Sequence, residues 1–116
     1  MAELVDGQGR VIASSVTLAK TLVERTVGLL GKKSLRQGEG IWIERCASIH
    51  TYFMRFPIDA VFVDGQNRVV QRVRNLAPWT LYAGCRDAAA CVELAAGTLA
   101  QSELSDGDVV FLRDRA

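Results

Sequence analysis

A pair of apolar runs in the middle of the chain constrains its fold more than any other feature. Residues 58–63 (IDAVFV) and 69–76 (VVQRVRNL) are rich in β-branched and aromatic side chains, and the turn-forming residues DGQN lie between them. So short a connection joins antiparallel neighbours. The sequence therefore predicts a β-hairpin over residues 58–76.

A single carboxylate interrupts the first of these runs. Strand alternation places Asp59 on the same face as Val61 and Val63, and both faces of the strand look at least half buried. A buried carboxylate needs hydrogen-bond donors. Asp59 could accept backbone amides or pair with Arg55 or another arginine, or its pKa could rise on burial and suit a general acid or base. The structural role is favoured, because capped acids and ion pairs also perturb pKa values.

The remaining periodic segments predict further strands and two short helices. Strands are expected at residues 4–5, 10–14, 41–44, 49–56, 91–94 and 109–112, and helices at 21–30 and 98–104. Each helix would begin with a capping box, at Thr21 with Glu24 and at Thr98 with Gln101. We expect one α+β domain over residues 1–116, with a mostly antiparallel, strongly curled or barrel-like sheet and two short helices.

Charge and motif content exclude several classes of function. Fourteen basic against thirteen acidic residues give a formal charge of +1, too little to steer nucleic acid or an anionic membrane. The chain carries no secretory signal, and no apolar run approaches the ~20 residues of a membrane span. We therefore expect a cytoplasmic protein, with export if a leader has been removed. It has no P-loop, GxSxG elbow, dinucleotide fingerprint or HExxH motif, so no cofactor is expected.

Three cysteines and one histidine are the candidate metal ligands and nucleophiles. Cys46, Cys85, Cys91 and His50 are an acceptable ligand set for structural zinc. Cys46 and His50 in an extended segment would lie ~13 Å apart, however, so no metal site is expected. In an oxidising compartment Cys85 and Cys91 could instead form a disulfide, and the sequence does not decide between the two states. The default is three reduced structural thiols, without the base that a cysteine nucleophile needs.

Several motifs in a fixed order resemble a known family. The segment HTYFMRFPIDAVFVDGQNRVV is preceded by ERTVGLLGKKSL and GEGIWI and followed by NLAPW, VELAAGT and LSDGDVV. From Val16 to Val110 the sequence therefore resembles the Domain of Unknown Function 192 family, an uncharacterised protein family. The resemblance implies a compact single domain rich in β structure and supplies no catalytic residue. Many members look like exported or envelope-associated proteins with an N-terminal leader, and the present chain differs by starting directly at the domain.

The leading hypothesis for function is a non-catalytic binding or accessory module for a small ligand or a protein partner. Polar groups embedded among aromatic residues predict its pocket. The expected lining residues are His50, Met54, Arg55, Pro57, Asp59 and Trp79. The rival is a small enzyme in which Asp59 and His50 share acid and base roles, which requires the two side chains to converge within hydrogen-bond reach.

A third hypothesis rests on the spacing of three arginines. Arg68, Arg72 and Arg74 fall at even positions, so one strand face could bind a carboxylate, a phosphate or a nucleic-acid backbone. The near-zero net charge disfavours nucleic acid. Trp42 and Trp79 are expected in the core rather than on a stacking platform.

Overall fold

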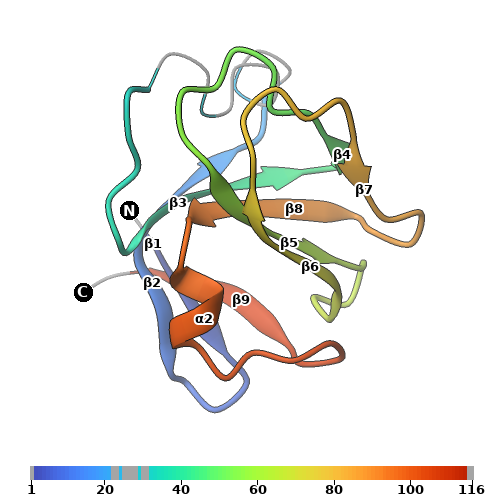
Figure 1. Cartoon of the computed structure of the whole chain (residues 1–116). Helices are drawn as coiled ribbons and strands as arrows, with labels where there is room; N and C mark the ends of the chain where they lie inside the picture. Colours follow the sequence, from blue (N-terminus) through green and yellow to red (C-terminus); the bar gives the residue numbers. More distant parts are fainter. Residues whose placement is uncertain (1, 22–23, 25–28, 30–31, 115–116) are drawn as a thin grey trace.

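A seven-stranded sheet forms the body of the molecule (Figure 1). The structure, a computed structural model, describes residues 2–21, 24, 29 and 32–114. The strands of the sheet, in spatial order, are β6 (Val69–Leu76), β5 (Ile58–Val63), β8 (Ala90–Ala95), β3 (Glu39–Glu44), β2 (Val11–Ala19), β1 (Ala2–Asp6) and β9 (Val110–Asp114). Strands β4 (Ser48–Ile49) and β7 (Ala83–Gly84) pair separately, and α2 (Thr98–Gln101) precedes β9.

The sheet corrects the predicted fold class. Strands β2 and β3 pair in parallel, because the long connection over residues 20–38 allows the chain to return in the same direction. The sheet is also open, with β6 and β9 at its edges, and one isolated bridge between Arg68 and Val109 joins those edges without forming a ladder. The chain is therefore mostly β with a mixed sheet, and the prediction of an α+β, curled or barrel-like fold was wrong.

The helices correct the prediction as well. In the described part of the chain α2 is the one helix, and no helix there is long and apolar enough to cross a membrane. The helix expected at 21–30 lies largely outside the described residues. Its capping box is nevertheless present: the Glu24 N–H donates to the Thr21 hydroxyl, and the Thr21 N–H donates to the Glu24 carboxylate, both at 3.1 Å.

The hairpins follow the sequence closely, whereas one long strand does not form. Strands β5 and β6 have the predicted bounds and pair in an antiparallel ladder, and β1 and β2 also pair in an antiparallel ladder. The strand predicted at 49–56 is wrong, because β4 ends at Ile49 and residues 50–57 form a loop. That loop is fixed by hydrogen bonds to another loop rather than by a strand ladder.

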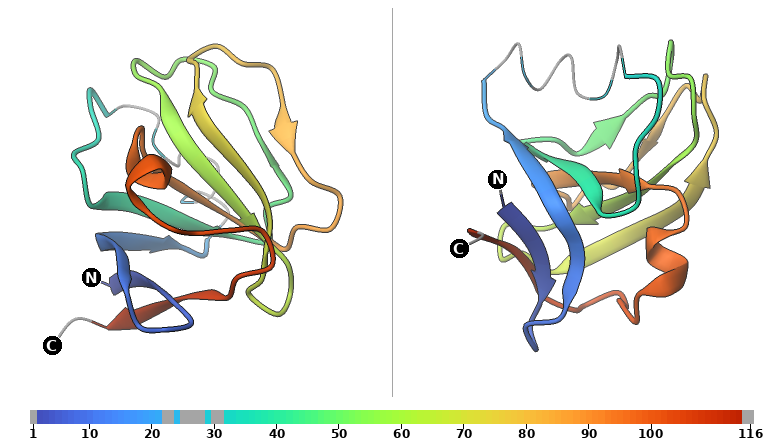
Figure 2. Two further views of the ribbon diagram at one scale, coloured as in Figure 1. Left: turned by 60° about the horizontal axis from the view of Figure 1, so that its bottom comes forward. Right: turned by 90° about the vertical axis from the view of Figure 1, so that its left-hand side faces the viewer.

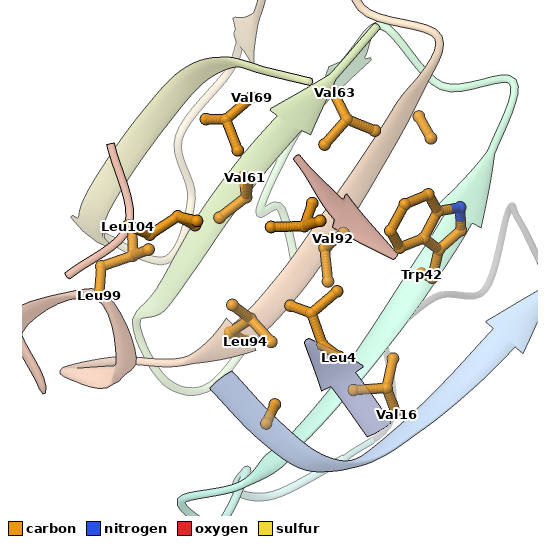
Figure 3. Packing of buried hydrophobic residues seen from close by; sticks show 13 residues of the cluster. Leu4, Val16, Trp42, Val61, Val63, Val69, Val92, Leu94, Leu99 and Leu104 are labelled. Atoms are coloured by element: carbon orange, nitrogen blue, oxygen red, sulfur yellow. The ribbon is translucent and has the colours of Figure 1, made fainter. Parts of the chain in front are cut away.

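The two faces of the sheet are covered differently. One face, here called the α2 face, packs a single large apolar cluster, and Figure 3 shows its main members: Leu4, Val16, Trp42, Val61, Val63, Val69, Val92, Leu94, Leu99 and Leu104. The other, here called the loop face, carries smaller clusters under the loops that contain β4 and β7. Its buried members include Ile41, Ile43, Met54, Ile58, Ala60, Phe62, Leu76 and Cys91. Each large side chain so buried contributes about 1.5 to 3 kcal/mol.

Candidate functional site

One buried threonine joins two loops on the loop face. These loops are residues 50–57, between β4 and β5, and residues 77–82, between β6 and β7, and they lie at the end of the molecule away from α2 (Figures 1 and 2). Thr51 is fully buried. Its hydroxyl donates to the carbonyl of Ala77 at 2.6 Å and accepts the N–H of Thr80 at 2.8 Å.

The backbone of the same residue completes the connection. The Thr51 N–H donates to the Thr80 carbonyl at 3.0 Å, and the Thr51 carbonyl accepts the N–H groups of Met54 at 3.2 Å and Trp79 at 2.8 Å. A buried polar group is costly to leave unpaired, so each of these bonds opposes separation of the loops. The two loops therefore behave as one unit at their base.

Two aromatic residues project from this unit in a strained conformation. Phe53 has φ 66° and Trp79 has φ 63°, in the left-handed region that side chains with a Cβ avoid. Such a conformation costs about 1 to 3 kcal/mol and persists only where the surroundings impose it. The two ring centroids lie 4.8 Å apart, yet the residues are 70% and 59% exposed. The loops therefore hold these two rings at the surface at an energetic cost.

Neighbouring side chains extend the two rings into a larger surface. Tyr52 contacts the Trp79 ring at 5.8 Å and the His50 ring at 5.5 Å. Leu81 and Tyr82 are 71% and 64% exposed on the second loop. We call the group the aromatic surface, which consists of Tyr52, Phe53, Trp79, Leu81 and Tyr82.

A glycine allows the second loop to close against β4. A Cβ at Gly84 would lie 2.7 Å from the Ala47 carbonyl oxygen and 2.7 Å from the Tyr82 hydroxyl. Any side chain there would push the β7 backbone away from β4 or displace the tyrosine. The absence of a side chain at Gly84 thus leaves room for the Tyr82 hydroxyl.

Asp59 lies apart from the aromatic surface. The residue is 1% exposed, and it faces Leu94 across the ladder between β5 and β8, so its side chain belongs to the α2 face. One carboxylate oxygen accepts the Asn75 N–H at 2.8 Å, and the other accepts the Leu99 N–H at 2.9 Å. Asp59 was expected either to accept backbone amides or to pair with an arginine, and it accepts backbone amides.

The second predicted capping box, Thr98 with Gln101, is wrong, because the Asp59 carboxylate accepts the Leu99 N–H instead. The Thr98 hydroxyl donates to the Ala95 carbonyl at 2.7 Å, and the residue at the N-cap of α2 is Gly97, which has no capping side chain. Asp59, which lies in β5, provides the capping oxygen for α2 in place of an N-cap side chain. Its carboxylate therefore fastens α2 and the irregular end of β6 to β5.

The other predicted pocket residues divide between core and surface. Met54 is buried in the loop-face core, whereas Arg55 and Pro57 are exposed. His50 is exposed, and its Nδ1 atom accepts the Tyr52 N–H at 3.2 Å. In the described structure His50 and Asp59 are hydrogen-bonded to different partners and not to each other. Of the six predicted residues, His50 and Trp79 are the ones brought together, through the Tyr52 ring.

The two tryptophans have different positions. Trp42 is buried in the α2-face cluster, as expected. Trp79 is exposed, so its predicted place in the core was wrong. Its left-handed backbone turns the side chain outward, and no alternation rule could have anticipated this conformation.

The three arginines of the anion-binding hypothesis have different surroundings. The Arg72 guanidinium donates to the Asp106 carboxylate at 2.9 Å and to the Leu104 carbonyl at 2.7 Å. Arg68 donates to the Gln66 side chain at 3.4 Å, and Arg74 is exposed. Arg72 therefore holds the segment before β9 rather than a ligand.

The cysteines are free thiols in the structure. Cys91 is fully buried on the loop face, and burial raises the pKa of its thiol well above the ordinary value, with the nearby Glu93 and Cys46 adding to the rise. A thiol held protonated in this way is a poor nucleophile. Within the described residues no group of three or more His, Cys, Asp or Glu side chains could hold a metal ion.

One buried carboxyl group was missed by the sequence reasoning. Glu93 faces Ile41 on β3 and Ala60 on β5, so it lies on the loop face, and it is 4% exposed. Its side chain makes no hydrogen bond or ion pair with the residues that the structure describes. Burial raises the pKa of Glu93 to about 7. The argument made for Asp59, a carboxylate inside an apolar strand, applies equally to the run CVELA and would have found it.

Comparisons with known proteins agree on family and fold. A family model described as Uncharacterized ACR (DUF192) matches residues 3–112. A UPF0127 protein of Thermococcus kodakarensis is 28% identical over 107 residues, covering 89% of this chain and 68% of its own length. A protein of unknown function from Novosphingobium aromaticivorans matches with a TM-score of 0.81 and 24% identity, covering 95% of this chain and 82% of that one.

A second solved structure extends the comparison of folds. It is a candidate transcription regulator from Sinorhizobium meliloti, with a TM-score of 0.81 and 22% identity, covering 96% of this chain and 91% of that one. At this identity the likeness shows the fold alone.

Proposed function

Because the chain belongs to the DUF192 family, which has no assigned activity, we propose a function from its geometry: it is a binding module whose recognition surface is the aromatic surface. The observation that carries this proposal is the strained, exposed pair Phe53 and Trp79. Backbone strain of this kind concentrates at ligand clamps and binding sites, where it orients a side chain in advance.

The composition of the surface supports binding. Tyrosine, tryptophan and phenylalanine are enriched in interface cores, where each buries a large area at little cost in side-chain entropy. The chain has two tyrosines, and both belong to this surface. Exposing several large apolar groups on two joined loops is unfavourable, so such a group indicates a partner.

Photo-cross-linking at the surface tests the proposal. The photoreactive residue p-benzoylphenylalanine would replace Trp79 in one variant and Phe111, an exposed aromatic residue on the edge strand β9, in a second. After irradiation in the cells that naturally produce the protein, mass spectrometry would identify adducts. We expect a discrete adduct at position 79, lost on the further change Phe53→Ala, and none of that mass at position 111.

Two outcomes count against the proposal. Equal labelling at both positions would mean that position 79 meets only what collides with any exposed residue. The absence of any adduct at position 79, in a variant whose circular dichroism matches the parent, would mean that the aromatic surface is not occupied.

A further inference from the structure

The three cysteines gather on the loop face, although they lie far apart in sequence. Cys91 is buried there in a cluster with Ala60 and Phe62. Cys46, shortly before β4, and Cys85, directly after β7, pack against the same cluster. Cys91 has no exposed surface, whereas the other two are half-buried. A small reagent in solvent can therefore reach Cys46 or Cys85 before it reaches Cys91.

The backbone fixes Cys46 beside the strand that carries Cys91. The Cys46 N–H donates to the carbonyl of Ala89, the second residue before Cys91, at 3.1 Å. The Cys46 Sγ atom donates to the Ser48 carbonyl at 3.1 Å. The Cys46 thiol also lies near enough to Cys91 to contribute to the raised pKa of that residue. Cys46 is therefore placed to pair with Cys91.

A buried carboxyl group adjoins this pair of thiols. Glu93 and Cys91 are alternate residues of β8, so their side chains share the loop face, about 6.6 Å apart along the strand. Glu93 is 4% exposed, and no described residue donates a hydrogen bond to its side chain. Ile41 on β3 and Ala60 on β5 face Glu93 and carry no titratable group. The Cys91 thiol is thus the titratable group beside Glu93 on this strand.

We propose that Cys46 and Cys91 form a reversible disulfide by exchange with a low-molecular-weight disulfide, and that Glu93 carries the proton of the buried thiol. Cys46 reacts first because solvent reaches it, and Cys91 reacts second from behind it. This activity uses residues outside the aromatic surface and goes beyond the function proposed above.

The exchange proceeds in two steps. In the first, the Cys46 thiolate bonds to one sulfur of the small disulfide, whose S–S bond breaks, and the other half leaves as a thiolate. In the second, the Cys91 sulfur bonds to the Cys46 sulfur and the second half leaves as a thiolate, while the Cys91 proton passes to the Glu93 carboxylate. Two protein thiols are oxidised to one disulfide, and the small disulfide is reduced to two thiols. Their protons come through solvent from Cys46 and from Glu93.

Burial suits Glu93 to this task. Its pKa is raised to about 7, so both of its forms are present near neutral pH. Glu93 can therefore accept a proton when the disulfide forms and return it when the disulfide is reduced. The raised pKa of Cys91 makes such an acceptor necessary, because the thiolate is the attacking species in exchange.

Reaction of the folded protein with glutathione tests the inference. The reduced protein would be mixed with oxidised glutathione, quenched with acid at intervals, alkylated with N-ethylmaleimide and mapped by mass spectrometry. We expect a mixed disulfide at Cys46 that converts to a disulfide between Cys46 and Cys91, and its reversal in excess reduced glutathione. Cys85→Ser should behave like the parent, whereas Cys91→Ala should stop at the mixed disulfide.

Changes at Glu93 separate a proton carrier from a residue that only packs. Glu93→Gln should slow the second step at least about tenfold and change the first step less than about twofold. Glu93→Asp keeps a carboxyl group and should recover part of the lost rate. Circular dichroism of each variant would establish that it is folded before the reaction. In urea, where the fold no longer selects a pair, all three pairings of the cysteines should appear.

Three results would overturn the inference. The first is a folded product in which Cys85 is the main partner of either other cysteine. The second is a parent protein that stays reduced, or stops at the mixed disulfide, and forms the disulfide between Cys46 and Cys91 only in urea. The third is a Glu93→Gln variant that slows both steps equally or neither, because the carboxyl group would then carry no proton in the exchange.

Discussion

Two buried strand carboxylates, Asp59 on the α2 face and Glu93 on the loop face, have opposite surroundings. On the α2 face, Asp59 accepts two backbone N–H groups and fastens α2 to the sheet. On the loop face, Glu93 has no partner among the described residues, and burial raises its pKa to about 7. One carboxyl group is satisfied by hydrogen bonds, whereas burial of the other favours its neutral form.

The two faces around these carboxylates also differ in their packing and in their exposed side chains. The α2 face has one large apolar cluster, with Arg72 tying down the segment before β9. The loop face carries exposed rings, two of them on a left-handed backbone. The comparison teaches that the strained backbone of Phe53 and Trp79 and their exposed rings lie on the loop face, and these are features that a recognition surface requires.

The largest effect is expected from removing the cap on the α2 face. Asp59→Ala leaves the N–H groups of Asn75 and Leu99 without this acceptor, and each donor so left costs about 1 to 3 kcal/mol, so the free energy of unfolding should fall by about 2 to 6 kcal/mol. Urea unfolding at pH 7 measures it. Asp59→Asn keeps one carbonyl acceptor and should lose about half as much. A loss below about 1 kcal/mol for Asp59→Ala would mean that the carboxylate does not hold the fold.

Stability should fall with rising pH because of Glu93. Its pKa of about 7 in the folded protein lies above the ordinary 4.5, so the folded state binds the proton more tightly than the unfolded state does. The stabilisation from this tighter proton binding is fully present below about pH 4.5 and is lost as the pH rises through 7. It amounts to about 3 kcal/mol. Urea unfolding at pH 5 and pH 8 measures the loss. Glu93→Gln should flatten this dependence, and an unchanged pH profile in that variant would exclude Glu93 as its source.

A smaller effect is expected from the threonine that joins the loops. Thr51→Val keeps the shape of the side chain but removes the hydroxyl, which leaves the Ala77 carbonyl and the Thr80 N–H without this partner. The free energy of unfolding should fall by about 2 kcal/mol. Thr51→Ser keeps the hydroxyl and should lose less. If valine and serine are equivalent in urea unfolding, the hydroxyl does not fasten the loops.

The smallest change in stability should come from Phe53 itself. Phe53→Gly relieves about 1 to 3 kcal/mol of backbone strain and gives up about 0.5 to 1.5 kcal/mol of ring contact and about 0.5 to 1 kcal/mol of chain entropy. These contributions nearly cancel at their midpoints, so the net change should lie between a loss of about 1.5 and a gain of about 2 kcal/mol. Val11→Gly, at an exposed position in β2, relieves no strain and is the control. A greater loss for Phe53→Gly than for Val11→Gly would show that the left-handed backbone stores no strain.

The sequence predicts the parts of the fold that depend on local pattern. The bounds of β5 and β6 follow from β-branched runs around a turn, and the alternation of Asp59 with Val61 and Val63 is confirmed by their place on the α2 face. The parallel pairing of β2 with β3 is not predictable in this way, because it depends on the path of a long connection. The cap on α2 cannot be predicted from local sequence either, since its acceptor comes from a strand 40 residues away in sequence.

The candidate site was predicted less well, for a specific physical reason. The segment 49–56 has the composition of a strand, so the prediction for His50 and Met54 follows strand alternation. The hydrogen bonds of Thr51 instead impose a loop, which buries Met54 and turns Phe53 outward. Propensity did not decide this segment, because tertiary hydrogen bonds outweigh the roughly 1 kcal/mol range of strand preferences.

Time-resolved fluorescence anisotropy of Trp79 tests the central claim most directly, namely that the loop face holds its rings in place for a partner. The change Trp42→Phe would leave Trp79 as the sole tryptophan, with circular dichroism to establish the fold. We predict that the anisotropy decays mainly with the tumbling of the whole molecule, and that adding Thr51→Val introduces a fast component. If most of the anisotropy is lost before the molecule tumbles, the ring moves freely and the claim is contradicted.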